Sequence, residues 1–415
     1  MSSIRKPESG SAPEPAERSA MSPPTRSPAT PPLLRHMNER TVLEVIRERA
    51  PISRAEISRT VGISKPTVSL ALQSLIDSGL VREAQPDGNG PSYGATFFEP
   101  VAEAALALGL DIGARFLRGA ICDLDGEVCA RQDVELAGAE ADAALDAAAE
   151  LKRGLVASCG LSAEAIDCAV VGVPGVVRGD DGVVRLAENV HGLEGMRVGP
   201  ELERRLGVEV TVENDVNLAA LGEQWLGLGR GVADFAFLSI GTGLGAGVVL
   251  HGELHRGHNG GAGEVDYALG GGPERDSDPC AEALSAFAER AAASGGGRTR
   301  LEQPFDVPAI FAAARTGDPL AVSVVDEEAR RVALHVAPIA AVIDVELVVL
   351  GGGIGANGDL LLPRIRSVLD RSLPYPPRLE ASSLGDAAVL SGALAVARDA
   401  ALDSVFENRG RAAPG

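Results

Sequence analysis

Between Pro51 and Leu80 the apolar positions recur at helical spacing on two short segments separated by a tight turn. Ser53 precedes the first segment and Glu56 follows three residues later, which is the spacing of a capping box. Gly62 ends this segment, because glycine adopts a left-handed conformation without steric cost. Ser64 then caps a second helix. The apolar positions expected to face a core are Ala55, Ile57 and Val61 in the first helix, and Val68, Leu72, Leu75 and Ile76 in the second.

Flanking segments extend this pair of helices to a domain over residues 33–99. An upstream helix over Leu34–Arg49 would bury Val42, Leu43 and Ile46. Downstream, Gly79–Arg82 and Ala95–Phe98 read as strands around a turn-rich loop at Pro86–Pro91. The pattern predicts a winged helix-turn-helix, whereas an ordinary helical hairpin, the alternative, would lack the two strands.

The exposed face of the second helix is polar and fits a DNA major groove. Its expected DNA-binding residues are the cap Ser64 together with Lys65, Thr67, Ser69 and Gln73. Arg54 or Arg59 would contact phosphate, which positions the protein without reading sequence. The whole chain carries a net charge of −20, yet Pro31–Gln85 holds eight basic and six acidic side chains. Because this excess is small, we expect two such domains to bind one operator, and hence a dimer.

Composition limits the remaining possibilities. Met1–Pro32 is rich in Ser, Pro and Ala without an apolar run, which predicts a disordered arm rather than a signal peptide. Residues 405–415 are expected to form a flexible tail. No segment approaches the ~20 apolar residues of a membrane helix, so we expect no membrane partner. The five cysteines are odd in number and scattered, which indicates reduced thiols and a cytoplasmic protein.

From Ala104 to Ser404 strands and helices alternate, which predicts an α/β body. Glycine-rich turns follow apolar strands within Leu106–Gly126, Phe235–Leu250 and Leu347–Gly355. Glycines let backbone N–H groups approach an anion closely, and Asp111 at the first turn can sit beside the phosphates and metal of a nucleotide.

The segment VENDVN, residues 212–217, ends a strand and opens a helix. Asp215 would lie where the helix dipole stabilises a carboxylate. It could face a cleft and accept a proton from a sugar hydroxyl that attacks ATP. Alternatively, Asn214 or Asp215 serves only as a helix cap.

The winged helix-turn-helix, the DIG hairpin, VENDVN, GTGLGAG, GAGE and the GGG turn occur in the order found in the ROK family, which the chain resembles over Arg35–Arg398. That family groups sugar-responsive repressors with sugar kinases on a two-lobed, actin-like fold. The resemblance implies lobes over 104–226 and 227–404, the second serving for dimerisation and the ligand cleft. It also implies that Asp215 corresponds to the catalytic base of the kinases. Asn189, Asn214 and Glu264 would bind the sugar, although each could instead be a satisfied polar group in a loop or cap.

The chain departs from the family's kinases at three places. Tyr267 stands where a histidine serves sugar and zinc, and Cys280 alone remains of three zinc-module cysteines, so we predict no zinc. In the phosphate hairpin, Ala114 and Arg115 replace a glycine and a threonine, so we expect weak or absent ATP binding and no cofactor. Tyr267 joins the expected ligand-binding residues.

These observations predict a transcriptional regulator, a repressor of carbohydrate genes, rather than an enzyme. Its partners would be a double-stranded DNA operator and a sugar or sugar derivative bound between the lobes, in a homodimer or homotetramer. Two alternatives stay open: an active sugar kinase with an appended DNA-binding module, and a ligand-independent DNA-binding dimer.

Overall fold

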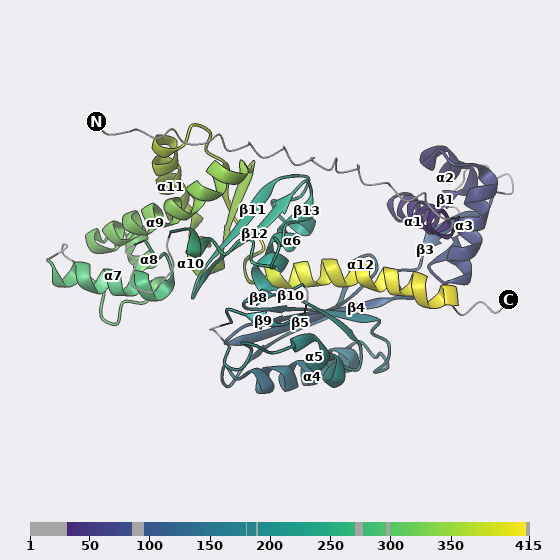
Figure 1. Cartoon of the computed structure of the whole chain (residues 1–415), viewed down its shortest axis with the longest axis horizontal. Coiled ribbons are helices and arrows are strands. Elements are labelled where there is room, and N and C mark those ends of the chain that lie inside the picture. Colours follow the sequence, from purple (N-terminus) through teal and green to yellow (C-terminus); the bar gives the residue numbers. More distant parts are fainter. Residues whose placement is uncertain are drawn as a thin grey trace, which may run out of the picture.

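The computed structural model describes residues 31–84, 95–179, 181–187, 190–269, 277–295 and 299–411. They form an N-terminal domain and two α/β lobes, arranged along the long axis of the molecule in Figure 1. The helices within these ranges are all too short or too polar to cross a membrane.

The N-terminal domain is a winged helix-turn-helix, as the sequence predicts. Its elements are α1 (Pro31–Arg49), β1 (Ile52–Ser53), α2 (Arg54–Val61), α3 (Lys65–Asp77), β2 (Val81–Ala84) and β3 (Phe97–Pro100). β3 lies between β1 and β2 and pairs antiparallel with both. Phe98 of β3 is buried together with Ile46, Ile57 and Leu75, so the wing and the three helices share one core.

The capping residues predicted from the sequence begin and end α2. Ser53 accepts the N–H of Glu56, whose carboxylate accepts the N–H of Ser53, and Gly62 has a φ of 76°. Three details differ from the prediction. Ala55 is exposed, because it lies on the solvent side of the short helix α2. Both wing strands begin two residues later than predicted, at Val81 and Phe97, and α1 begins at Pro31, inside the predicted arm. The rest of that arm and the loop at Pro86–Pro91 lie outside the described residues.

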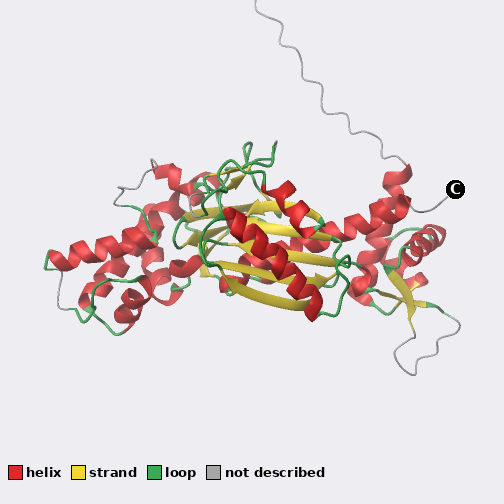
Figure 2. Ribbon diagram, turned by 90° about the horizontal axis from the view of Figure 1, so that it is seen from below, coloured by secondary structure: helices red, strands yellow, loops and turns green. Residues whose placement is uncertain are grey.

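Lobe 1 is built on a five-stranded sheet of order β10-β7-β4-β5-β6. Its elements are η1 (Ala102–Ala104), β4 (Leu106–Ile112), β5 (Phe116–Asp123), β6 (Val128–Glu135), α4 (Ala141–Ser158), β7 (Cys168–Val173), β8 (Val176–Val177), β9 (Val184–Arg185), α5 (Val198–Leu206), β10 (Glu209–Asn214) and α6 (Asp215–Leu226). The parallel strands β4, β7 and β10 form its centre, and α4 and α5 cover one face, where they share a core with the sheet. Figure 2 shows strands and covering helices from below.

Lobe 2 has a second five-stranded sheet, of order β13-β12-β11-β14-β15. Its elements are β11 (Phe235–Ile240), β12 (Leu244–Leu250), β13 (Glu253–Leu254), η2 (Val265–Leu269), α7 (Ala281–Ala293), α8 (Val307–Arg315), α9 (Pro319–Ile343), β14 (Leu347–Gly351), α10 (Gly352–Gly355), α11 (Gly358–Ser372) and β15 (Arg378–Ala381). The antiparallel pair β11–β12 beside parallel β14 matches the glycine-turn strands expected from the sequence. The two sheets and their helices confirm the predicted α/β class and the predicted division into two lobes.

The last helix differs from the prediction in two ways: it packs on lobe 1 although it was assigned to lobe 2, and it extends into the predicted tail. After η3 (Gly385–Ala387), α12 (Ala388–Arg411) leaves lobe 2 and packs on the lobe 1 sheet, on the face opposite α4. It continues beyond Ser404, and Val405 is only 3% exposed, so the flexible tail was predicted to begin too early. The lobe 1 sheet needs an apolar cover on its second face, and α12 provides it with Leu394, Ala397 and Ala401.

Candidate functional site

The face of α3 opposite its buried stripe is the candidate DNA interface. Lys65, Leu70 and Gln73 are exposed on it, and Leu70 is 70% exposed. Three hydroxyls are already engaged within the helix and its cap. The Ser64 Oγ accepts the N–H of Thr67 and lies 2.8 Å from the Thr67 hydroxyl, and the Ser69 hydroxyl donates to the Lys65 carbonyl at 2.9 Å. The side chains most available to bases are therefore Lys65, Leu70 and Gln73.

Of the remaining predicted interface residues, Gln73 is engaged on the helix surface and Arg54 is exposed. Gln73 donates from Nε2 to Asp77 at 2.8 Å, a contact on the helix surface that a base would replace. Arg54, the first residue of α2, is exposed and can reach a phosphate. Leu70 was not among the predicted DNA-binding residues, because from the sequence alone it could either contact a thymine methyl or pack into the core.

The turn from β10 to α6 places Asn214 and Asp215 where the sequence predicts a strand followed by a helix. The Asn214 Oδ1 accepts the N–H of Asn217 at 2.9 Å and so caps α6. Its Nδ2 donates to the Gly175 carbonyl at 2.9 Å and to Asp215 at 3.3 Å. Asn214 is thus a helix cap in this structure, as the alternative interpretation expected, and its remaining role depends on exchange of these bonds for ligand bonds.

Asp215 has a perturbed carboxyl group. Burial raises the pKa of Asp215 to about 7, and the charge of Asp111 adds to the rise, while its bond from the Val216 N–H opposes it. Burial likewise raises the pKa of Asp111 to about 6, against the opposing effect of the Arg118 guanidinium at 3.1 Å. A carboxyl group with a pKa near 7 can accept a proton at neutral pH.

The hairpin of β4 and β5, which corresponds by sequence resemblance to the kinases' phosphate hairpin, carries ion pairs between side chains of this chain. Arg118 of β5 is mostly buried, pairs with Asp111, and reaches Asp133 and Asp386 at 3.7 Å each. Arg115 pairs with Glu135 at 3.0 Å. The Asp111 carboxylate is therefore paired with the Arg118 guanidinium. The sequence did not reveal Arg118 because its three partners are scattered along the chain.

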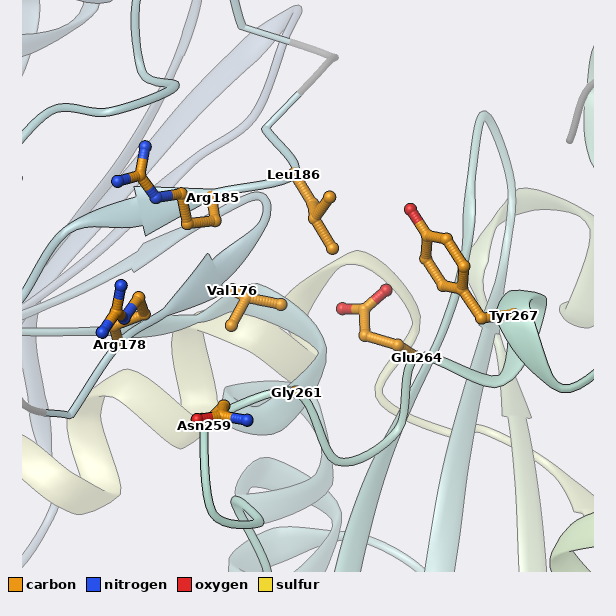
Figure 3. Close-up of a pocket in the computed structure, with 8 residues that line it drawn as sticks. All are labelled: Val176, Arg178, Arg185, Leu186, Asn259, Gly261, Glu264 and Tyr267. Carbon is orange, nitrogen blue, oxygen red and sulfur yellow. The ribbon is translucent and has the colours of Figure 1, made fainter. Parts of the chain in front are cut away.

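A cavity of about 250 Å³ lies between the lobes. The hairpin β8–β9 and the residue after it line one side with Val176, Arg178, Arg185 and Leu186, and lobe 2 lines the other with Asn259, Gly261, Glu264 and Tyr267. In Figure 3 the Glu264 carboxylate points into this space, and the Tyr267 hydroxyl leans towards Leu186. Burial and then the charge of Asp266 raise the pKa of Glu264.

Of the five predicted ligand residues, the structure brings Glu264 and Tyr267 together in this cavity. Asn214 and Asp215 do not line it, although the charge of Glu264 contributes to the raised pKa of Asp215. Asn189 lies outside the described residues. Tyr267 is 57% exposed, so its ring is available to stack on a ligand.

The described residues near Tyr267 offer no ligand set for a structural zinc ion. Within the described ranges no three His, Cys, Asp or Glu side chains gather as metal ligands. Burial raises the pKa of the Cys280 thiol, which disfavours the thiolate that zinc requires. His251, His255 and His258 are exposed, as expected for loop residues. Most of the zinc-module segment lies outside the described residues, so the absence of zinc stays a prediction, to be checked by elemental analysis of purified protein.

Comparison with known proteins places these features in a family. A model described as the ROK family matches residues 107–400, and a winged helix-turn-helix DNA-binding model matches residues 38–82. The xylose repressor of Caldicellulosiruptor bescii is 27% identical over 389 residues, covering 88% of this chain and 96% of the relative. A glucokinase of Streptomyces coelicolor is 30% identical over 320 residues, covering 71% of this chain and 98% of the relative.

Solved structures agree with this assignment of the fold. The crystal structure of a ROK family transcriptional regulator, a homolog of the E. coli MLC protein, matches with a TM-score of 0.76 and 23% identity, over 91% of this chain and 98% of the other. A ROK family glucokinase from Streptomyces griseus in complex with glucose and AMPPNP matches with a TM-score of 0.61 and 29% identity, over 71% of this chain and 100% of the other.

Proposed function

The chain belongs to the ROK family, and from this premise we propose that it is a DNA-binding transcriptional repressor whose affinity for its operator is controlled by a sugar or sugar derivative. The relative named a xylose repressor matches 88% of this chain, which is more than the two lobes contain, whereas the glucokinase matches 71%, a share about equal to the two lobes. The proposal rests on that full-length similarity and on one structural observation, the path of α12.

α12 runs from the junction of the two lobes to the winged domain (Figure 1). Its first turns pack on α6, the helix that begins at Asp215. Its last described turns contact α1, where Asp403 pairs with Arg40 and the Phe406 ring lies 4.9 Å from His36 at an angle of 78°. Since 24 residues of helix span about 36 Å, a rotation of α6 on sugar binding would be carried as a rigid movement to the winged domain.

The size of the required coupling is modest. A 100-fold change of operator affinity on sugar binding corresponds to about 2.7 kcal/mol of coupling free energy. The buried contacts of α12 with lobe 1 and with α1 belong to one continuous apolar core, which includes Val42, Leu218 and Val405. A single packed core transmits displacement because it is not continuously deformable.

In the proposed complex, α3 enters the major groove and two winged domains of a homodimer or homotetramer read two half-sites. Lys65 and Gln73 would bond to base edges or phosphates, and the exposed Leu70 would contact a thymine methyl. Arg54 would position the domain on a phosphate. Size-exclusion chromatography with light scattering measures the oligomeric state directly.

A gel shift with DNA from upstream of the protein's own gene tests DNA recognition. Lys65→Ala should weaken specific binding by about tenfold or more. Arg153→Ala is the matched control, because it removes the same charge from the exposed face of α4, far from the winged domain, and should bind as the wild type does. Equal binding by wild type and both variants, with no preference over unrelated DNA, would refute specific recognition through α3.

The same assay tests the sugar response. Xylose and glucose are the first sugars to add, because the relatives are named for them. Glu264→Gln should retain operator binding and lose release by sugar, whereas Glu289→Gln, on the exposed side of α7, should be released normally. Binding that no sugar affects, in the wild type, would favour the ligand-independent dimer.

One observation supports the alternative of an active kinase: the carboxyl group of Asp215, at the start of α6, has a pKa of about 7 and suits a general base. Against it stand the Asp111–Arg118 pair and the altered phosphate hairpin. Sugar-dependent release of ADP from ATP, abolished by Asp215→Asn, would establish the kinase.

A further inference from the structure

The loop 255–264, between β13 and η2, carries Glu264 into the cavity and is held by close backbone contacts. A Cβ at Gly260 would lie 2.6 Å from the Val177 carbonyl of lobe 1, and one at Gly263 would lie 1.7 Å from the Ala246 carbonyl of lobe 2. The Ala262 N–H donates to the Arg256 carbonyl at 3.1 Å. The loop therefore touches both lobes, and its shape leaves little freedom to Glu264.

Arg256 is the charged link of this loop to lobe 1. Its Nε donates to the Glu213 Oε2 at 2.6 Å. Glu213 lies at the end of β10 and is only 7% exposed. Its Oε1 accepts the Asn217 Nδ2 at 2.9 Å and the N–H of Asn214 at 3.0 Å. Glu213 thus connects Arg256 to the residues on both sides of Asp215.

Arg256 does not line the cavity that contains Glu264. It lies instead on a neighbouring cavity of about 370 Å³, together with Glu213 and Val177. Its side chain is 55% exposed, whereas the carboxylate it binds is buried, so loss of the guanidinium would leave a buried charge without its counter-ion. A change at Arg256 would therefore release the loop from its anchor on Glu213.

We propose that Arg256 is a positioning residue of the effector site, which sets the separation of Glu264 from the Asn214–Asp215 turn by holding loop 255–264 against buried Glu213. This inference rests on the proposed function, because it concerns how the same cleft recognises a sugar. The hydroxyls of one sugar can bond to carboxylates on both lobes only when those carboxylates lie at the matching distance. The Arg256–Glu213 pair fixes that distance before the ligand arrives, which lowers the cost of binding.

The test compares sugar-induced release from the operator for the wild type, Arg256→Gln, Glu213→Gln and the double variant. Arg290→Gln, on the exposed surface of α7, is the matched control. We expect Arg256→Gln to need at least about tenfold more sugar, because small misplacement of a binding group is costly, while operator affinity without sugar stays within about twofold. The double variant should need no more sugar than the worse single variant, since both changes break one interaction.

Arg256→Lys keeps the positive charge but lacks the planar guanidinium group. It replaces Arg256→Gln in the test if that variant folds poorly, and it should need an amount of sugar between those of the wild type and Arg256→Gln. Release at the wild-type sugar concentration in either Arg256 variant would overturn the inference, as would additive effects in the double variant. Absence of release from the wild type by any sugar would instead refute the sugar-responsive function, so the two failures are distinguishable.

Discussion

The contact between α6 and α12 is close enough that a single methyl group should disturb it. A Cβ at Gly392 of α12 would lie 1.8 Å from the Leu218 carbonyl oxygen and 3.0 Å from the Gly222 nitrogen. A Cβ at Gly222 of α6 would lie 2.2 Å from the Ala388 carbonyl oxygen. The helices touch backbone to backbone, so alanine at residue 392 would have to push them apart by more than about 1 Å to reach van der Waals distance.

Two opposing terms determine the effect of Gly392→Ala on the free energy of unfolding. Alanine favours a helix interior over glycine by about 1 kcal/mol. Overpacking costs about 1–3 kcal/mol, and we expect the upper end because the obstructing atoms belong to the backbone. The net expectation is a destabilisation of about 1–2 kcal/mol.

Gly154→Ala in α4 is the matched control. A Cβ there would meet only the Gln132 Oε1, at 3.3 Å, which is the end of an exposed side chain that can move away. This variant should gain up to about 1 kcal/mol from helix propensity. Two alanine substitutions in helix interiors should therefore change stability in opposite directions.

Urea unfolding followed by tryptophan fluorescence measures this difference at the contact itself. The chain has one tryptophan, Trp225, at the end of α6, and the Arg398 guanidinium of α12 lies 5.0 Å from its ring centroid. If Gly392→Ala unfolds at the same urea concentration as Gly154→Ala, or a higher one, α6 and α12 are not packed as described. The proposed route from the cleft to the winged domain would then lose its basis.

Three further predictions concern stability. Because burial raises the pKa of Asp215 to about 7 and that of Asp111 to about 6, above the value of 3.8 for an unperturbed aspartate, the native protein binds protons that the unfolded chain has lost. The ligand-free thermal midpoint should therefore fall from pH 5 to pH 8, and Asp215→Asn should reduce that fall; equal pH dependence in variant and wild type would contradict it. Val405→Ala should cost about 2 kcal/mol in urea unfolding, against less than about 0.5 kcal/mol for Val342→Ala at an exposed position of α9. Ser53→Ala should destabilise the winged domain by about 1 kcal/mol by removing the capping box, seen as faster amide exchange in α2; unchanged exchange would show that the cap contributes nothing.

Local signals predicted the winged domain nearly residue by residue. The capping box at Ser53, the left-handed Gly62 and the cap at Ser64 each depend on chemistry within three or four residues, so sequence alone specifies them. The same holds for the strand-to-helix turn at Asn214. Both wing strands begin two residues later than predicted, because their register depends on burying Phe98 against helices that are distant in the sequence.

The candidate effector site was predicted in part. Motif resemblance identified Glu264 and Tyr267, which do share a cavity. It did not identify Arg118 or Arg256. A short motif covers neighbouring residues, whereas an ion pair joins two separate positions, and the partner of Arg256 lies 43 residues away. Nor did it show that Asp215 stands outside that cavity, because the lining of a cavity depends on how the two lobes pack together.

The sequence by itself determined the type and order of the elements, the helix caps, the polar face of α3 and the family, because these follow from periodicity, turn chemistry and short motifs. Only the tertiary structure decided the path of α12. Its sequence would form the same helix against either lobe. It packs on lobe 1 because one apolar face of that sheet is otherwise uncovered and because Gly222 and Gly392 allow α6 and α12 to approach closely. That choice brings residues 388–411 from the cleft to the winged domain, and the proposed regulation depends on it.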